Sequence, residues 1–160
     1  MKKNNHFAII ITAKKYNNIL RRALKAIYKQ TILPQQLIIV LAETGKIIIP
    51  KNIQSKVVYS QIKNQVYQRT IGLKFLKKNI KIILQLDDKI ILEKNSIKSL
   101  LDEWKNADKN IAGIALNPQN YVRPKTGLFH LLTLTNSNID GEILSSGFAN
   151  GWSEEKENKK

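Results

Sequence analysis

The sequence predicts an α/β fold, a three-layer α/β/α arrangement around a mostly parallel sheet. Continuous apolar runs rich in β-branched residues recur along the chain, as expected of strands that are buried on both faces. Segments with a helical apolar stripe lie between these runs. Because strands that alternate with helices are typical of βαβ units, the pattern favours parallel strands with helices on both faces of the sheet.

Each predicted strand is a short apolar run, and the runs are 7–11, 36–41, 56–59, 81–86 and 111–116. The predicted helices carry apolar residues three and four positions apart and span about 19–27, 64–78 and 97–104. In the first helix, Arg21, Arg22 and Lys25 are expected to point outward. Asn95 or Ser96 is expected to cap the third helix, since short polar side chains accept hydrogen bonds from its free amides.

The helix predicted at 64–78 contains a glycine in its interior. Val66, Leu73 and Leu76 form its apolar stripe and are expected to face the sheet. Gly72 costs up to ~1 kcal/mol relative to alanine in a helix. We therefore expect that close packing of the backbone requires glycine at this position.

Length and composition indicate one domain, residues 1–152, followed by a charged and disordered tail at 153–160. The strand and helix pattern changes from Asn117, and 129–134 is expected to form one more strand. The chain has no cysteine, which excludes disulfides and thiolate metal sites. The apolar run near the N-terminus is too short for a signal peptide or a membrane span, so we expect a soluble, cytoplasmic protein.

The formal net charge is +15, and most of the excess is lysine spread evenly along the chain. Only four arginines are present, whereas nucleic-acid surfaces favour the bidentate arginine fork. We therefore expect no specific nucleic-acid partner. Peripheral contact with an anionic membrane surface remains open, because a positive field attracts phosphate-bearing surfaces. A basic protein that binds nucleic acid or an anionic surface is thus one alternative function.

Asp87 and Asp88 end an apolar predicted strand, and Glu43 is the only carboxylate that precedes them. Adjacent carboxylates repel each other and are tolerated best beside a cation, a metal or a ligand. Ligands of open α/β sheets bind at the carboxyl ends of the strands. Thr12 and Glu43 follow two other predicted strands, so we expect Thr12, Glu43 and Asp87 to share one edge and to surround a phosphorylated ligand. Alternatively, each is an ordinary residue of a turn.

Short motifs occur in order along the chain, at 9–12, 22–24, 29–31, 67–73, 86–93 and 141–148. Together they resemble family 2 glycosyltransferases of the GT-A fold, and the likeness covers about 7–150. The resemblance implies a nucleotide-sugar-binding domain of an enzyme that transfers a sugar to the hydroxyl of a glycan or lipid-linked acceptor. It further implies that Thr12 and Glu43 contact the nucleoside, that Arg69 neutralises phosphate, and that Asp87 and Asp88 bind ribose and any metal.

The chain also departs from the pattern of that family. Lys89 stands where the family has the acid that usually binds Mg²⁺ or Mn²⁺, which argues against a metal on Asp88, and an ammonium group could hold the diphosphate instead. The chain ends soon after Trp152, so we expect the acceptor-binding half to be missing, and no catalytic base can be assigned. A truncated or degenerate donor-binding module without turnover is therefore a second alternative.

Overall fold

The computed structural model describes residues 6–49 and 52–116, and the chain as far as Ile114 forms one compact unit. Its elements, in chain order, are β1 (Phe7–Ala13), α1 (Asn18–Tyr28), β2 (Gln36–Leu41), β3 (Ser55–Tyr59), α2 (Gln65–Leu73), β4 (Ile82–Asp87) and α3 (Ser96–Asn106). The four strands form one parallel sheet in the order β3-β2-β1-β4. The first four strands predicted from the sequence are thereby confirmed.

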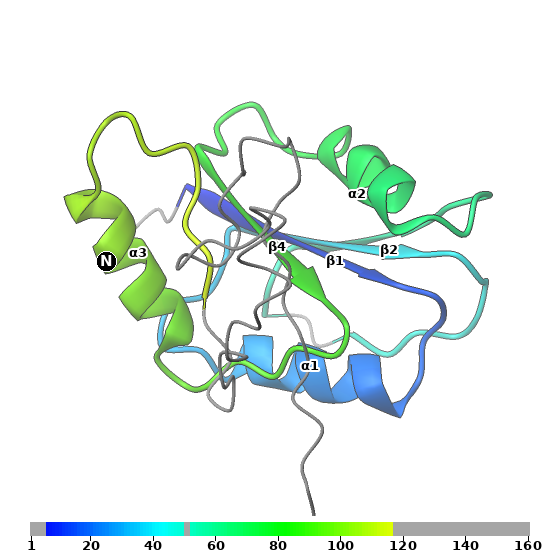
Figure 1. Ribbon diagram of the computed structural model, residues 1–160. Helices are drawn as coiled ribbons and strands as arrows, with labels where there is room; N and C mark the ends of the chain where they lie inside the picture. Colours follow the sequence, from blue (N-terminus) through cyan, green and yellow to red (C-terminus); the bar gives the residue numbers. More distant parts are fainter. Residues whose placement is uncertain (1–5, 50–51, 117–160) are drawn as a thin grey trace, which may run out of the picture. The chain divides into compact units, whose positions relative to one another are not determined.

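The sheet lies between two helical layers, as predicted for an α/β/α fold (Figure 1). Successive residues of a strand point to opposite faces, so β1 divides its side chains between two clusters. Ile9 and Ile11 pack with the face formed by α1 and α3, whereas Ile10 packs with α2. The apolar stripe of α1 consists of Leu20, Ala23, Leu24 and Ile27, all of them buried. As predicted, its basic residues are exposed.

The fifth predicted strand, 111–116, is wrong. These residues adopt no strand, and Ile111 and Leu116 are 46% and 37% exposed. The run contains Gly113 and two alanines, which favour extended structure weakly, and apolar character alone does not supply a hydrogen-bonding partner. The strand predicted at 129–134 and the tail at 153–160 lie outside the described residues.

The prediction for the second helix is partly wrong. The helix ends at Leu73, and Val66 and Leu73 are 70% and 40% exposed. The buried positions of α2 are instead Gln68 and Gly72. A Cβ atom added to Gly72 would lie 2.7 Å from Cγ2 of Ile10, so the predicted need for close packing is confirmed.

The side chain of a buried glutamine, rather than that of Asn95 or Ser96, accepts a hydrogen bond from a free backbone amide at the start of α3. Asn95 precedes the helix but makes no capping hydrogen bond with its side chain. Gln30, 6% exposed, accepts a hydrogen bond from the amide of Ile97 (3.1 Å) and donates one to the carbonyl oxygen of Glu93 (2.6 Å). One amide side chain therefore ties the end of α1 to the start of α3.

Candidate functional site

The direction in which successive strands are added to the sheet reverses at β1. From β1 the chain proceeds through β2 to β3 on one side, and it then returns to add β4 on the other side of β1. In open α/β sheets, the crevice at the carboxyl ends of such a pair of strands is where ligands bind. Thr12 and Asp87 are register partners in this pair, so the structure brings these two predicted site residues together.

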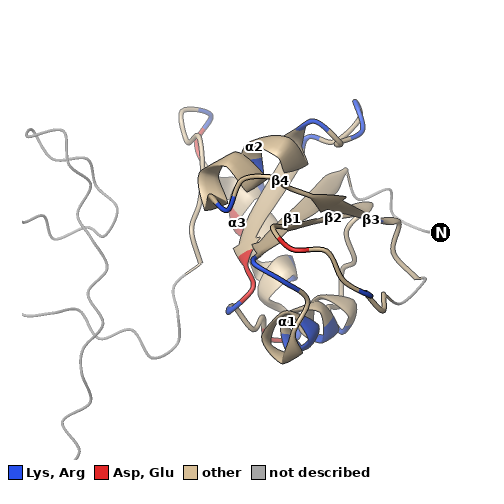
Figure 2. Ribbon diagram, turned by 90° about the vertical axis from the view of Figure 1, so that its right-hand side faces the viewer, with Lys and Arg blue, Asp and Glu red and all other residues tan. Residues whose placement is uncertain are grey.

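A hollow of about 340 Å³ opens at this edge, and acidic and basic segments meet there (Figure 2). Its volume is at the lower end of the range for small-molecule sites. Its lining residues come from the ends of β1, β2 and β4 and from the start of α2; they are Thr12, Ala13, Lys14, Ala42, Lys63, Gln65, Gln68, Asp87, Asp88 and Lys89. Three of the five predicted donor-binding residues, Thr12, Asp87 and Asp88, therefore line one hollow.

Thr12 offers a hydrogen-bonding group that the described residues leave unused. Its side chain is 2% exposed, and no described residue bonds its Oγ1. A buried hydroxyl without a partner is costly, and in a site it is a candidate for a ligand contact. The neighbouring carboxylate of Asp87 is held in place, since its Oδ1 accepts a hydrogen bond from Nε2 of Gln65 at 2.7 Å.

Burial raises the pKa of Asp88 above its usual value, and repulsion from Asp87 raises it further. Lys89 and backbone hydrogen bonds oppose both effects. The negative charge of Asp88 is therefore disfavoured in the structure as it stands. A hydroxyl group or a cation brought to this carboxylate would relieve that cost, which is a common property of ligand sites.

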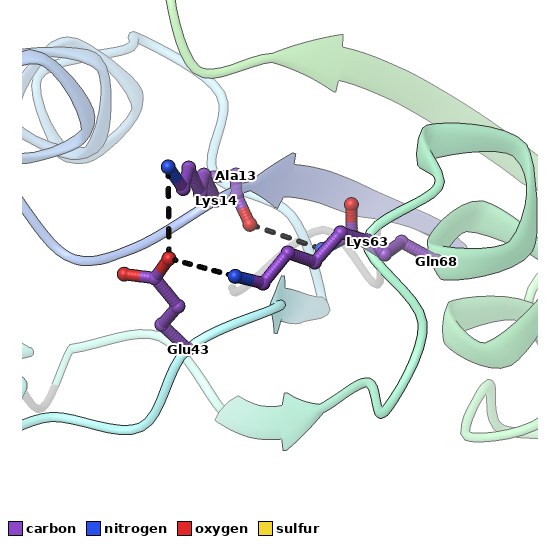
Figure 3. Close-up of polar contacts among 5 residues, drawn as sticks. All are labelled: Ala13, Lys14, Glu43, Lys63 and Gln68. Carbon is purple, nitrogen blue, oxygen red and sulfur yellow. Dashed lines mark hydrogen bonds and ion pairs between the residues drawn. The ribbon is translucent and has the colours of Figure 1, made fainter.

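Glu43 does not line the hollow, but its carboxylate pairs with two lysines that do (Figure 3). Its carboxylate is 3.7 Å from Nζ of Lys14 and 3.5 Å from Nζ of Lys63. Both lysine side chains are about two-thirds exposed, and exposed ion pairs contribute about 0–1 kcal/mol. The two ammonium groups are therefore held near the hollow but remain free to turn toward an anion.

Gln68 fixes the start of α2 against the sheet (Figure 3). It is 5% exposed, and its Nε2 donates to the carbonyl oxygens of Ala13 (3.0 Å) and Val40 (3.3 Å). Gly72 lies one helical turn further on and lets the backbone approach β1. These contacts determine where Gln65 and Lys63 stand relative to the carboxyl ends of the strands.

Arg69 and Lys89 occupy different places. Lys89 lines the hollow, whereas Arg69 does not, although the Nε atom of Arg69 is buried and no described residue bonds it.

No group of three or more acidic or histidine side chains that could hold a metal occurs among the described residues. Asp87 and Asp88 supply oxygen ligands, but the ammonium of Lys89 shares their hollow, so these residues do not fit the acidic metal site that the resemblance implies.

Sequence reasoning missed the parts of the site that come from the segment before β4. Lys14, Lys63 and Gln65 are not among the site residues predicted from the sequence, and Gln68 belongs only to the resembling segment 67–73. The available signal was their position, because Lys63 and Gln65 follow β3 directly and must begin at its carboxyl end. The last segment of the resemblance, 141–148, lies outside the described residues.

No protein-family model matches the chain, and no curated protein is similar enough in sequence to count as a relative. Solved structures do match its fold. The crystal structure of S. aureus TarS 1-349, a glycosyltransferase, aligns with a TM-score of 0.51 and 13% identity over 73% of this chain and 40% of that one. A second crystal structure of S. aureus TarS aligns with a TM-score of 0.47 and 16% identity over 71% of this chain and 23% of that one.

The likeness to the TarS 1-349 structure shows a GT-A-like α/β fold. The chain spans less than half the length of the TarS structures that it matches. At this identity the likeness concerns the fold and assigns no residue a role. None of the helices in the described part of the chain is long and apolar enough to cross a membrane.

Proposed function

We propose that the hollow between β1 and β4 binds a nucleotide-sugar donor, and that the chain is the donor-binding part of a glycosyltransferase. The observation that carries this proposal is the convergence of Thr12, Asp87 and Asp88 on one hollow at the point where the strand order reverses. Carboxylates accept hydrogen bonds from ribose hydroxyls, and the GT-A-like fold supports a sugar donor over other nucleotides.

In this proposal the lysines of the hollow, not a divalent metal, hold the diphosphate. Lys14, Lys63 and Lys89 supply three ammonium groups, and ammonium groups bind phosphate as point charges. Glu43 balances two of them in the free protein. Asp87 and Asp88 then face the ribose, and Thr12 offers its free hydroxyl to the nucleoside. The acceptor is a hydroxyl of a glycan or of a lipid-linked molecule. The bond between the sugar and the diphosphate breaks, the sugar bonds to that oxygen, nucleoside diphosphate leaves, and the hydroxyl loses its proton.

Calorimetry of the full chain with UDP, GDP and their sugar conjugates, with and without Mn²⁺, tests donor binding. Asp88→Asn should weaken binding about tenfold, the equivalent of losing one hydrogen bond to a charged group. Asp102→Asn is the matched control, because Asp102 is a half-exposed carboxylate on α3. If neither nucleotide binds, or if both variants lose affinity equally, the hollow is not the donor site.

Glu43→Gln separates two roles at the same edge. Inorganic pyrophosphate should bind this variant more tightly, since Lys14 and Lys63 lose their internal partner. A nucleoside without phosphate should bind it more weakly if Glu43 contacts the base or ribose. Tighter binding of both ligands would limit Glu43 to restraining the lysines.

Turnover is measured by release of nucleoside diphosphate from the bound donor. Release in the presence of an acceptor alcohol supports an enzyme. Binding without release supports the alternative of a donor-binding module that lacks turnover.

A further inference from the structure

Helix α1 carries a basic face that the proposed donor site does not use. Arg21, Arg22, Lys25 and the C-cap residue Lys29 are exposed, and 12 consecutive residues from Asn18 to Lys29 include no acid. At about 100° per residue, these four side chains fall within an arc of about 100°. The buried stripe of the helix occupies the opposite side. Figure 2 shows the resulting concentration of basic segments along α1.

Two hollows flank this basic face. One, of about 600 Å³, is lined by Arg22, Lys25, Ala26, Lys29, Ile91, Leu92 and Lys94. The other, of about 450 Å³, is lined by Tyr16, Arg21, Leu24, Lys25, Tyr28, Lys29 and Ile48. Lys25 and Lys29 line both hollows and therefore stand on the ridge between them. Neither hollow shares a residue with the lining of the proposed donor site.

The cations of this face take no part in the ion pairs found in the described part of the chain. Arg21, Arg22, Lys25, Lys29 and Lys94 form no ion pair with any described acid, in contrast to Lys14 and Lys63, which share Glu43. The face also exposes aliphatic carbon, since Ile48 is 70% and Ile91 is 50% exposed. A partner that fits must offer several anions at a surface and an apolar layer close behind them.

We infer that this basic face of α1 docks on the surface of an anionic phospholipid bilayer. Phosphate headgroups pair with the ammonium and guanidinium groups, and Ile48 and Ile91 enter the boundary between headgroups and acyl chains. A nucleic acid would also supply phosphates, but it has no use for exposed aliphatic side chains and would favour free aromatic rings for stacking. The tyrosine rings of this face, Tyr16 and Tyr28, are instead partly buried against the core, and the hydroxyl of Tyr16 donates to the carbonyl oxygen of Ile48 at 3.2 Å.

Vesicle sedimentation with the full chain tests this inference. The vesicles contain phosphatidylcholine alone or with 30% phosphatidylglycerol, and a 20-base-pair DNA duplex serves as the competing polyanion. The test variant is Arg22→Gln/Lys25→Gln/Lys29→Gln. The control variant, Lys74→Gln/Lys78→Gln/Lys81→Gln, removes the same charge from exposed positions outside α1.

We expect binding to the anionic vesicles only, and it should weaken with added salt. Each cation near such a surface contributes roughly fivefold to partitioning, so the test variant should lose about 100-fold and the control variant only a few-fold. Ile91→Ser should weaken binding further without any change in charge.

Three results would overturn the inference. They are equal losses in the two triple variants, failure of the natural chain to bind anionic vesicles, and DNA binding that is tighter than vesicle binding and is lost in the test variant. The last result would assign the face to nucleic acid.

Discussion

Gly72 determines how closely α2 approaches the sheet, and Gly72→Ala tests that contact. The added Cβ would lie 2.7 Å from Cγ2 of Ile10 and 3.3 Å from Cγ2 of Val40, both in fully buried side chains. Carbon atoms normally pack at about 3.5–4.0 Å, so α2 or Ile10 must move by roughly 1 Å. Overpacking of this kind costs about 1–3 kcal/mol, whereas alanine gains about 1 kcal/mol in helix propensity.

The free energy of unfolding should therefore fall by up to about 2 kcal/mol in Gly72→Ala, as measured by urea denaturation. Gly45→Ala is the control, because a Cβ added there meets no atom within 4 Å. It should be neutral or slightly stabilising, since alanine reduces the entropy of the unfolded chain. In an Ile10→Ala background, Gly72→Ala should become stabilising, because the obstructing methyl group is gone.

Gly72→Ala should also weaken nucleotide binding, since movement of α2 displaces Gln65 and Gln68 from the hollow. An increase in stability of about 1 kcal/mol in the natural background would refute the reasoning. It would mean that helix propensity alone governs the position and that α2 accommodates the methyl group freely.

Three further predictions concern single side chains. Burial and repulsion from Asp87 raise the folded-state pKa of Asp88, so the folded protein binds the proton of this carboxyl group more tightly than the unfolded chain does. The stability that this bound proton contributes is lost as pH rises through the folded-state pKa. In thermal melts at pH 7, Asp88→Asn should therefore be more stable than the natural chain. The difference in stability should vanish below pH 3.8, where the carboxyl group is protonated in both states. An equal gain in stability from Asp102→Asn would contradict this explanation. Gln30→Ala should lower the free energy of unfolding by about 1–3 kcal/mol because the buried amide of Ile97 loses its partner and the carbonyl oxygen of Glu93 keeps only the amide of Ser96; Gln61→Ala, an exposed control, should change it by less than about 0.5 kcal/mol. Lys89→Asp should create Mn²⁺-dependent UDP binding in calorimetry, since oxygen ligands suit that ion; strong Mn²⁺ dependence in the natural chain would show that Lys89 does not occupy the metal position.

The fold could be predicted where burial alone determines structure. The strands β1 and β2 are covered on both faces, so they appear in the sequence as unbroken apolar runs. The apolar stripe of α1 was clear for the same reason. The run at 111–116 is also apolar but forms no strand, because it contains Gly113 and two alanines and because a strand also requires a partner with free hydrogen-bonding groups. Composition does not reveal that partner.

The burial of α2 could not be read from hydrophobic periodicity. Its contact with the sheet is made by a glycine backbone and a glutamine amide, while Val66 and Leu73 remain exposed. Gln68 is buried because the carbonyl oxygens of Ala13 and Val40 near the carboxyl edge accept its hydrogen bonds. Polar burial of this kind follows from the tertiary arrangement, so a sequence pattern that counts apolar residues misses it.

The order of the strands identifies site residues that hydrophobic periodicity does not reveal. A chain that leaves a parallel strand emerges at its carboxyl end, so the residues directly after β3 begin at the edge where ligands bind. The connection from β3 to β4 must then cross β2 and β1, and α2 is the helix of that crossover. Lys63, Gln65 and Gln68 stand at the start of this crossover and therefore reach the carboxyl ends of β1 and β4. Once strand order is known, topology alone places them in the hollow without any likeness to a known family. Variants of Lys63 and Gln65 should therefore affect nucleotide binding as strongly as variants of Asp88.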